Sequence, residues 1–220
     1  MNEKRIWDYL MKKIGNPCGV AGLMGNLYAE SGLNPINLQN TYERKLRMTD
    51  EAYTKAVDSG KYKASSFIRD SAGYGLAQWT YHKRKEKLLL FAVARKASIG
   101  DLDMQLDFLM KELDSSYKGV LKALCEAKSV RKASDIVLTQ YERPKNQGDS
   151  VKKKRASFGQ RYFDQFANQT DEENEEGEDE DMVNTEAENA WDVPEDMIFT
   201  LDANGNPVRL EVEDDADDQA

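Results

Sequence analysis

The sequence predicts a mainly α-helical domain over residues 1–168, followed by an acidic tail. Apolar residues recur at helical spacing through this region, and none of its segments alternates like a strand. Around residue 169 the composition changes abruptly to a run of acidic residues that cannot bury apolar surface. We therefore expect one helical domain, an acidic disordered linker over 169–190, and a C-terminal segment over 191–220 with an acidic end.

The segment 16–35 predicts the most informative helix. Asn16 suits its N-cap, and Gly32 can adopt the left-handed conformation that ends a helix. Apolar residues recur at helical spacing along one stripe: Val20, Leu23, Met24, Leu27 and Tyr28. Small residues fall on the opposite side, where another backbone could approach closely: Gly22, Gly25 and Ala29.

Glu30 lies in the last turn of this predicted helix, at the border of the apolar stripe. The negative end of the helix dipole and partial burial both disfavour its charge, so we expect its pKa to be raised. A raised pKa is what a general acid needs near neutral pH. The alternative is a surface glutamate near a helix end.

The remaining helices are predicted by their apolar spacing and end signals. In chain order, they are a helix containing Ile6 to Ile14, a short helix capped by Thr49, a helix over 82–96, one begun at Asp101, one over Tyr117 to Leu124, one over 129–141 that ends before Pro144, and one from Ser150. In the C-terminal segment, 197–201 and 208–212 flank Asn204-Gly205 and predict a short β-hairpin.

Charge divides the chain sharply. The whole chain has a net charge of −9, yet residues 171–220 contain 21 acidic residues and one arginine, a net of −20. Residues 1–170 contain 30 basic and 19 acidic residues, a net of +11. A basic domain suits a polyanionic surface such as nucleic acid, anionic lipid or a cell wall with anionic polymers.

Several classes are disfavoured by the sequence. The N-terminus has no apolar signal-peptide region and no run could span a bilayer, so we expect synthesis in the host cytoplasm without a signal peptide. With Cys18, Cys125 and the single histidine His82, we expect no disulfide framework, metal site or cofactor. A Cys–His peptidase is disfavoured because no orienting arrangement is visible.

Two separated motifs resemble those of the lysozyme superfamily. Glu30-Ser31 near a helix end is followed 45 residues later by Gly75-Leu76-Ala77-Gln78, as in goose-type lysozymes and soluble lytic transglycosylases. The longer segments Gly-Val-Ala-Gly-Leu-Met-Gly-Asn-Leu-Tyr-Ala-Glu-Ser-Gly-Leu (19–33) and Asp-Ser-Ala-Gly-Tyr-Gly-Leu-Ala-Gln-Trp (70–79) resemble the phage tail lysozyme family. This resemblance covers residues 4–168 and implies a lysozyme-like domain on a phage tail that opens peptidoglycan.

The resemblance also implies roles for single residues. Glu30 would be the general acid that protonates the glycosidic oxygen, and Ser31 and Gln78 would line the sugar site or orient Glu30. Asp70 lies near the position at which goose-type enzymes carry an acidic residue proposed to position water, although it could equally cap the following turn. Whether the reaction inverts or retains the configuration stays open.

Further candidates are less specific. Tyr141 matches the tyrosine that closes the cleft in transglycosylases, and it could equally be a core tyrosine. Tyr74 and Trp79 could stack on sugar faces or lie in the core. Glu142 and Glu43 are reserve candidates for the second carboxylate.

The sequence therefore predicts a muramidase of a phage tail, with Glu30 as acid and Asp70 as base. The alternatives are a lytic transglycosylase that uses Glu30 alone and a peptidoglycan-binding module that does not cut. Peptidoglycan strands are the expected partner and nucleic acid is disfavoured. The acidic tail could contact other tail proteins or mimic nucleic acid.

Overall fold

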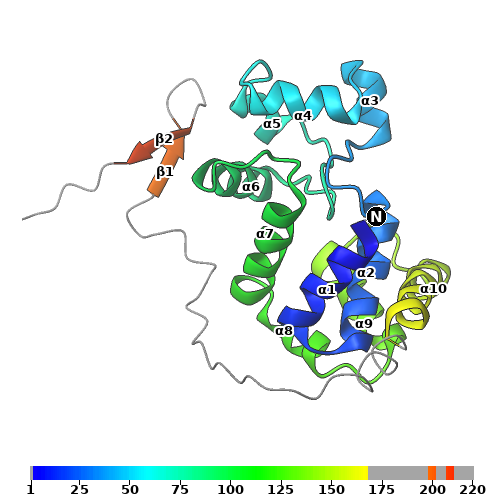
Figure 1. Cartoon of the computed structure of the whole chain (residues 1–220). Helices are drawn as coiled ribbons and strands as arrows, with labels where there is room; N and C mark the ends of the chain where they lie inside the picture. The colour runs from blue at the N-terminus through cyan, green and yellow to red at the C-terminus, as the bar shows by residue number, and fades with distance from the viewer. Residues whose placement is uncertain (1, 168–197, 202–206, 211–220) are drawn as a thin grey trace, which may run out of the picture.

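The computed structural model describes residues 2–167, 198–201 and 207–210, and the first of these ranges is mainly helical (Figure 1). Its elements, in order, are α1 (Asn2–Ile14), α2 (Pro17–Ser31), α3 (Asn40–Leu46), α4 (Asp50–Asp58), α5 (Ala64–Arg69), α6 (His82–Ala94), α7 (Leu102–Ser115), α8 (Lys118–Cys125), α9 (Val130–Ile136), the π-helix η1 (Val137–Glu142) and α10 (Asp149–Phe166). The mainly α-helical prediction is confirmed.

The helices form two groups that α6 and α7 join. Helices α3, α4 and α5 gather at one end of the molecule, and α1, α2, α8, α9 and α10 gather at the other (Figure 1). Helix α2 packs against α10, α9, α1 and α8, so it is the centre of the larger group. The last residue of this central helix follows Glu30 directly.

Helix α2 begins and ends as its sequence predicts. The Asn16 side chain accepts a hydrogen bond from the amide of Gly19 at 3.0 Å, which satisfies one of the free amides of the first turn. Gly32 adopts φ 64° and its amide donates to the carbonyl of Tyr28. Four residues of the predicted stripe are buried, with Leu23 and Leu27 fully inaccessible, and Tyr28 is partly buried. These end signals fix the position of Glu30 in the last turn.

Two glycines let neighbouring helices approach α2. A Cβ atom at Gly22 would lie 2.5 Å from the Cβ of Ala133 on α9, and one at Gly25 would lie 2.5 Å from the amide nitrogen of Gly159 on α10. Such distances are too short for any side chain, so the predicted close approach of another backbone is confirmed. This contact brings α10, which carries Arg155, alongside Glu30.

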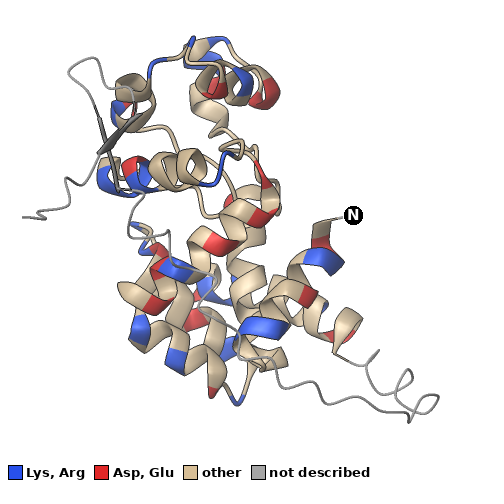
Figure 2. Cartoon of the chain, turned by 60° about the vertical axis from the view of Figure 1, so that its left-hand side comes forward, with Lys and Arg blue, Asp and Glu red and all other residues tan. Residues whose placement is uncertain are grey.

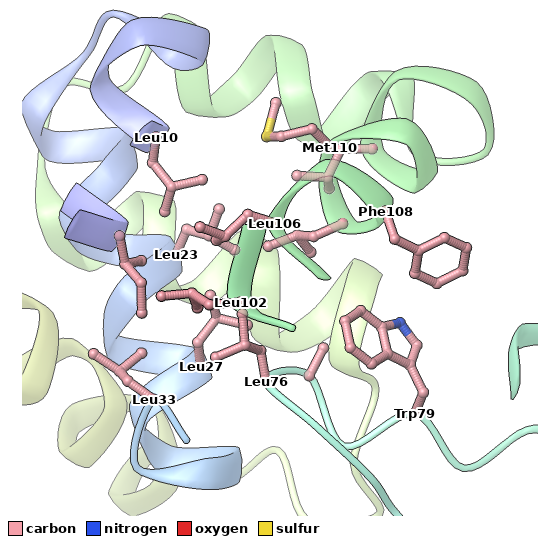
Figure 3. Packing of buried hydrophobic residues seen from close by; sticks show 14 of the residues in the cluster. Leu10, Leu23, Leu27, Leu33, Leu76, Trp79, Leu102, Leu106, Phe108 and Met110 are labelled. Carbon is pink, nitrogen blue, oxygen red and sulfur yellow. The ribbon is translucent and has the colours of Figure 1, made fainter. Parts of the chain in front are cut away.

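The hydrophobic core joins α2 to the Gly75-Leu76 turn. Figure 3 shows Leu23 and Leu27 of α2 facing Leu102 and Leu106 of α7, with Leu76 beside them. All but Leu102 are completely buried, and Leu102 is 7% exposed. The second sequence motif is therefore held against the first by the core.

One predicted helix ends differently from expectation. The segment 129–141 forms α9 and then widens into the π-helix η1, after which Arg143 adopts a left-handed conformation with φ 52°. The following Pro144 prevents continuation of the helix, as predicted. The wider turn places Glu142 at the end of η1, next to a residue with unfavourable backbone geometry.

Strands β1 (Ile198–Leu201) and β2 (Pro207–Leu210) pair antiparallel, with Ile198 opposite Leu210, in agreement with the predicted hairpin. The predicted Asn204-Gly205 turn and the acidic linker over 169–190 lie outside the described residues. Within the described part, basic and acidic residues are interspersed along the helices (Figure 2), and none of its helices meets the length and hydropathy that crossing a bilayer requires.

Candidate active site

A polar hollow of about 590 Å³ opens beside the end of α2, and we call it the cleft. Its lining comes from five places in the chain: Glu30, Asn37, Gln39, Asn40, Thr41, Ala77, Gln78, Thr80, Tyr81, Arg84, Glu142 and Pro144. Amide and hydroxyl groups dominate this lining, and such groups suit a carbohydrate better than an apolar ligand. Two carboxyl groups, Glu30 and Glu142, face the same hollow.

Glu30 lies at the edge of the cleft and is neither sealed off nor fully solvated. Its side chain is 20% exposed and forms an ion pair with Arg155 of α10, with 2.5 Å between Nη2 and Oε1. The sequence predicts an acid in apolar surroundings, whereas the structure adds a guanidinium group. This contact was not foreseeable locally because Arg155 lies 125 residues further along the chain.

Arg155 is held in place by buried polar groups behind Glu30. Its Nη1 donates to Oδ1 of Asn26 at 3.3 Å, and the amide nitrogen of Asn26 donates to the hydroxyl and carbonyl oxygens of Ser134. Asn26 and Ser134 are both fully buried. Helices α2, α9 and α10 thus fix the direction of the guanidinium group.

Glu142 is the second carboxyl group of the cleft. Its Oε1 atom is buried and has no hydrogen-bond partner within the described part of the chain. Burial, and then the negative charge of Glu30, raise the pKa of Glu142 to about 8, although Arg84 and Arg155 oppose this shift. The raised pKa favours the uncharged form of Glu142 while Glu30 is ionised.

Gln78 and Ser31 join the two sequence motifs. The Nε2 atom of Gln78 donates to the carbonyl and side-chain oxygens of Asn37 at 3.0 and 2.9 Å, and Gln78 lines the cleft in a left-handed conformation with φ 45°. Ser31 is buried, and its hydroxyl donates to the carbonyl oxygen of Leu76 at 2.9 Å. Gln78 can contact a ligand directly, whereas Ser31 supports the turn that carries it.

The three predicted aromatic residues are buried. The Nε1 of Trp79 and the hydroxyl of Tyr141 both donate to Oε2 of Glu112 at 2.8 Å, and the hydroxyl of Tyr74 contacts Thr54 at 2.6 Å. None of the three lines the cleft. Their predicted contact with sugar stays a prediction, and their position favours the alternative of core residues.

Glu112 is the common hydrogen-bond acceptor for the polar groups behind the cleft. In addition to Trp79 and Tyr141, it accepts two hydrogen bonds from Arg84, from Nε and Nη2, both at 2.7 Å. The Arg84 guanidinium group lies over the Tyr141 ring at 4.7 Å from its centroid. Arg84 lines the cleft, so this network fixes one of its walls.

Asp70 lies outside the cleft lining, in a separate cluster. Its Oδ1 accepts hydrogen bonds from Nζ of Lys85 at 2.6 Å and from the amide of Ala72 at 2.8 Å. Its Oδ2 accepts from the hydroxyl groups of Tyr53 at 2.5 Å and Tyr62 at 3.3 Å. The structure does not bring Asp70 together with Glu30, and the predicted catalytic base remains a prediction. The amide of Ala72 fits the alternative that Asp70 caps the turn.

Tyr81 is the aromatic residue that the sequence analysis missed. It is 53% exposed, lines the cleft, and also lines an apolar hollow of about 540 Å³ between α6 and α7. The sequence feature that could have identified Tyr81 is its position, two residues after the Gly-Leu-Ala-Gln-Trp motif. Glu43 lies on α3 and is absent from the cleft lining.

No group of three His, Cys, Asp or Glu side chains within residues 2–167 is arranged to hold a metal ion.

Comparison with known proteins adds two findings. The family model described as phage tail lysozyme matches residues 1–166. The chain is also 27% identical, over 153 residues, to morphogenesis protein 1 of Bacillus phage B103. This match covers 66% of the present chain and 34% of that protein, so the chain spans about a third of the length of its relative.

Proposed function

The chain belongs to the phage tail lysozyme family, and from this premise we propose that it cleaves the glycan strands of peptidoglycan as a muramidase. The observation that supports this proposal is the position of Glu30: a carboxyl group at the edge of an open polar cleft that also contains Gln78 and Arg84. The bond cleaved would join N-acetylmuramic acid to N-acetylglucosamine.

In the proposed reaction, Glu30 in its protonated form donates its proton to the glycosidic oxygen, so that the leaving sugar departs as an alcohol. Arg155 then faces the carboxylate that remains, and its positive charge stabilises that product of the proton transfer. Arg155 keeps its direction throughout because Asn26 and Ser134 hold it. The first step therefore needs only groups at the end of α2 and on α10.

The acceptor of the sugar decides between two reactions. A hydrolase needs water and a group to activate it, and Asp70 is the group that the resemblance implies. The contacts of Asp70 with Lys85 and Tyr53 instead favour a structural role. A lytic transglycosylase, in which a hydroxyl of the substrate itself attacks, needs no second carboxylate and is the second candidate.

Tyr81 is our candidate for the sugar-stacking role that the sequence assigns to Tyr74 and Trp79. Sugar faces are apolar and pack on aromatic rings that are exposed on at least one side. Tyr81 has a large side chain that is exposed, and it lines the cleft.

The test is digestion of purified peptidoglycan followed by mass spectrometry of the products. New reducing ends would indicate hydrolysis, anhydro-sugar ends would indicate transglycosylation, and binding without products would indicate a non-cutting module. The Glu30→Gln variant should lose activity on the order of 10³-fold or more while keeping the unfolding temperature of the wild type. Cleavage by this variant at the wild-type rate would refute the assignment of Glu30.

We further propose that the protein acts from the virion tail at the bacterial wall. The family description and the phage relative support this location. The acidic C-terminal segment, which lies largely outside the described residues, would contact other tail proteins. Proteomics of purified virions, with and without residues 170–220, tests both statements: loss of the truncated protein from the particle is the expected result.

A further inference from the structure

Glu142 has a buried oxygen atom that the folded chain leaves without a partner. Oε1 of Glu142 makes no hydrogen bond within the described residues, although most buried polar atoms in folded proteins have one. By contrast, the polar groups of Trp79, Tyr141 and Glu112 behind the cleft and of Arg84 at its wall form hydrogen bonds with one another. An unpaired buried oxygen is unfavourable for stability, so its presence needs an explanation other than folding.

The position of Glu142 supplies that explanation. Glu142 lines the cleft together with Glu30 and Gln78. It is the last residue of the π-helix η1 and precedes Arg143, whose φ is 52°. Both features are costly for the backbone and are frequent at functional sites. The unpaired oxygen thus belongs to a residue at the surface on which a ligand would lie.

We propose that the carboxyl group of Glu142 binds the acetamido group of the amino sugar that lies beside Glu30, and so positions the glycan for cleavage. This inference rests on the proposed function. Glu142 is a positioning residue, since the proton transfer itself is assigned to Glu30.

The protonation state of Glu142 suits this partner. Burial raises its pKa to about 8 and the charge of Glu30 adds to the shift. Below that pH the carboxyl group has one O–H donor and one carbonyl acceptor. The carbonyl oxygen of an acetamido group is an acceptor, so a neutral Glu142 can donate its O–H to that oxygen. An ionised Glu142 would offer acceptors only.

The surroundings of Glu142 contain charges of both signs. The groups whose charges act on it are Glu30, Arg84, Arg155, Glu112 and Tyr141. Arg84 is already paired with Glu112, and Arg155 is paired with Glu30. Burial, and then the Glu30 carboxylate when it is ionised, outweigh these two guanidinium groups, so the pKa of Glu142 is raised and its neutral form is favoured.

The first experiment compares Glu142→Ala with Glu142→Gln on peptidoglycan. Glutamine has the donor and acceptor of a neutral acid at nearly the same positions. The alanine variant should raise KM about tenfold, and the glutamine variant should restore KM to within about threefold of the wild type. A glutamine variant as inactive as Glu30→Gln would assign proton transfer to Glu142 and overturn the positioning role. Glu126→Gln, which removes an exposed carboxylate at the end of α8, is the matched control.

The pH profile separates this role from a structural one. In the wild type, 1/KM for the glycan should fall above pH 8 as Glu142 loses its proton. Loss of the Glu30 proton acts on kcat and is common to both proteins. The glutamine variant cannot ionise at position 142, so its 1/KM should lack that decline. An identical alkaline decline of 1/KM in both proteins would contradict the inference.

A binding measurement keeps this inference distinct from the proposed function. In the Glu30→Gln background, calorimetry compares oligomers of N-acetylglucosamine with deacetylated oligomers of the same length. Glu142 should confer a preference of about tenfold for the acetylated oligomer, kept by Glu142→Gln and lost in Glu142→Ala. If the wild type cleaves peptidoglycan but Glu142→Ala keeps the preference, only the present inference fails. If the wild type neither binds nor cleaves glycan, the proposed function fails as well.

Discussion

Two carboxylates in this molecule occupy opposite situations. Asp70 is almost fully buried and its two oxygens accept hydrogen bonds from Lys85, Ala72, Tyr53 and Tyr62. Glu30 is partly exposed at the cleft, and Arg155 is its ion-pair partner. A carboxylate whose lone pairs are all used by the protein has nothing left for a substrate. The contrast favours a structural role for Asp70, because all its hydrogen-bond partners come from the protein, and it leaves Glu30 as the carboxyl group of this pair that a ligand in the cleft could contact.

The largest expected effect concerns Asp70. Replacing Asp70 by Ala leaves the fully buried ammonium group of Lys85 without its counter-charge, and we expect a loss of about 3–5 kcal/mol in the free energy of unfolding. Urea denaturation measures this loss. Glu30→Ala, at a partly exposed pair, should cost about 1 kcal/mol or less. Equal losses of unfolding free energy in the two variants would contradict the structural role of Asp70. An Asp70→Asn variant that is stable but inactive would support its role as the catalytic base.

A pH-dependent effect sharpens the comparison at Glu142. Its pKa is about 8 in the folded protein and about 4.3 in an unfolded chain. Between these values the folded state holds the additional proton, so rising pH favours unfolding and the stability contribution is lost as pH rises through 8. Relative to Glu142→Gln, the wild type should lose on the order of 4 kcal/mol between pH 4 and pH 8. Denaturation midpoints of both proteins across this range measure the difference, and a constant difference would contradict the raised pKa.

A smaller effect separates the buried aromatic residues from a sugar-binding role. Trp79→Phe removes the hydrogen bond from Nε1 to Glu112 inside the network behind the cleft. We expect a loss of about 1–3 kcal/mol in stability and little change in KM for the folded fraction. Thermal denaturation and initial rates at low temperature measure the two quantities. A rise in KM at unchanged stability would support the predicted stacking of Trp79 on sugar.

The smallest effect is expected at Tyr81. Because this ring is exposed, Tyr81→Ala should change stability by less than about 0.5 kcal/mol. Loss of a stacking contact, worth about 1 kcal/mol, should raise KM roughly fivefold. Tyr81→Trp is the control that keeps an aromatic face and should retain the wild-type KM. Unchanged KM in the alanine variant would remove Tyr81 from the sugar site.

Local signals in the sequence were sufficient for much of the fold. Asn16 and Gly32 define the ends of α2, the glycines of α2 mark the close approach of α9 and α10, and Pro144 marks the end of η1. These features depend on backbone geometry within a few residues, and single residue types report on them. The same signals placed Glu30 in the last turn of α2.

The partners of the site could not be predicted in this way. Arg155 reaches Glu30 from α10 and appears in the sequence as part of a basic run. In the sequence, Trp79 resembles a sugar-stacking aromatic and Tyr141 resembles the tyrosine that closes the cleft. The structure shows that Glu112, on another helix, accepts hydrogen bonds from both. Such pairings depend on tertiary packing between distant segments, so the spacing of residues along one helix does not predict them.

Consecutive residues of α6 are paired in two directions. Arg84 is paired with Glu112 of α7, and the next residue, Lys85, is paired with Asp70 beyond α5. Moving the segment that carries Asp70 away from α7 would therefore break at least one of these ion pairs. Arg84 lines the cleft, so a glycan strand would enter a cleft in which the position of this residue is already fixed.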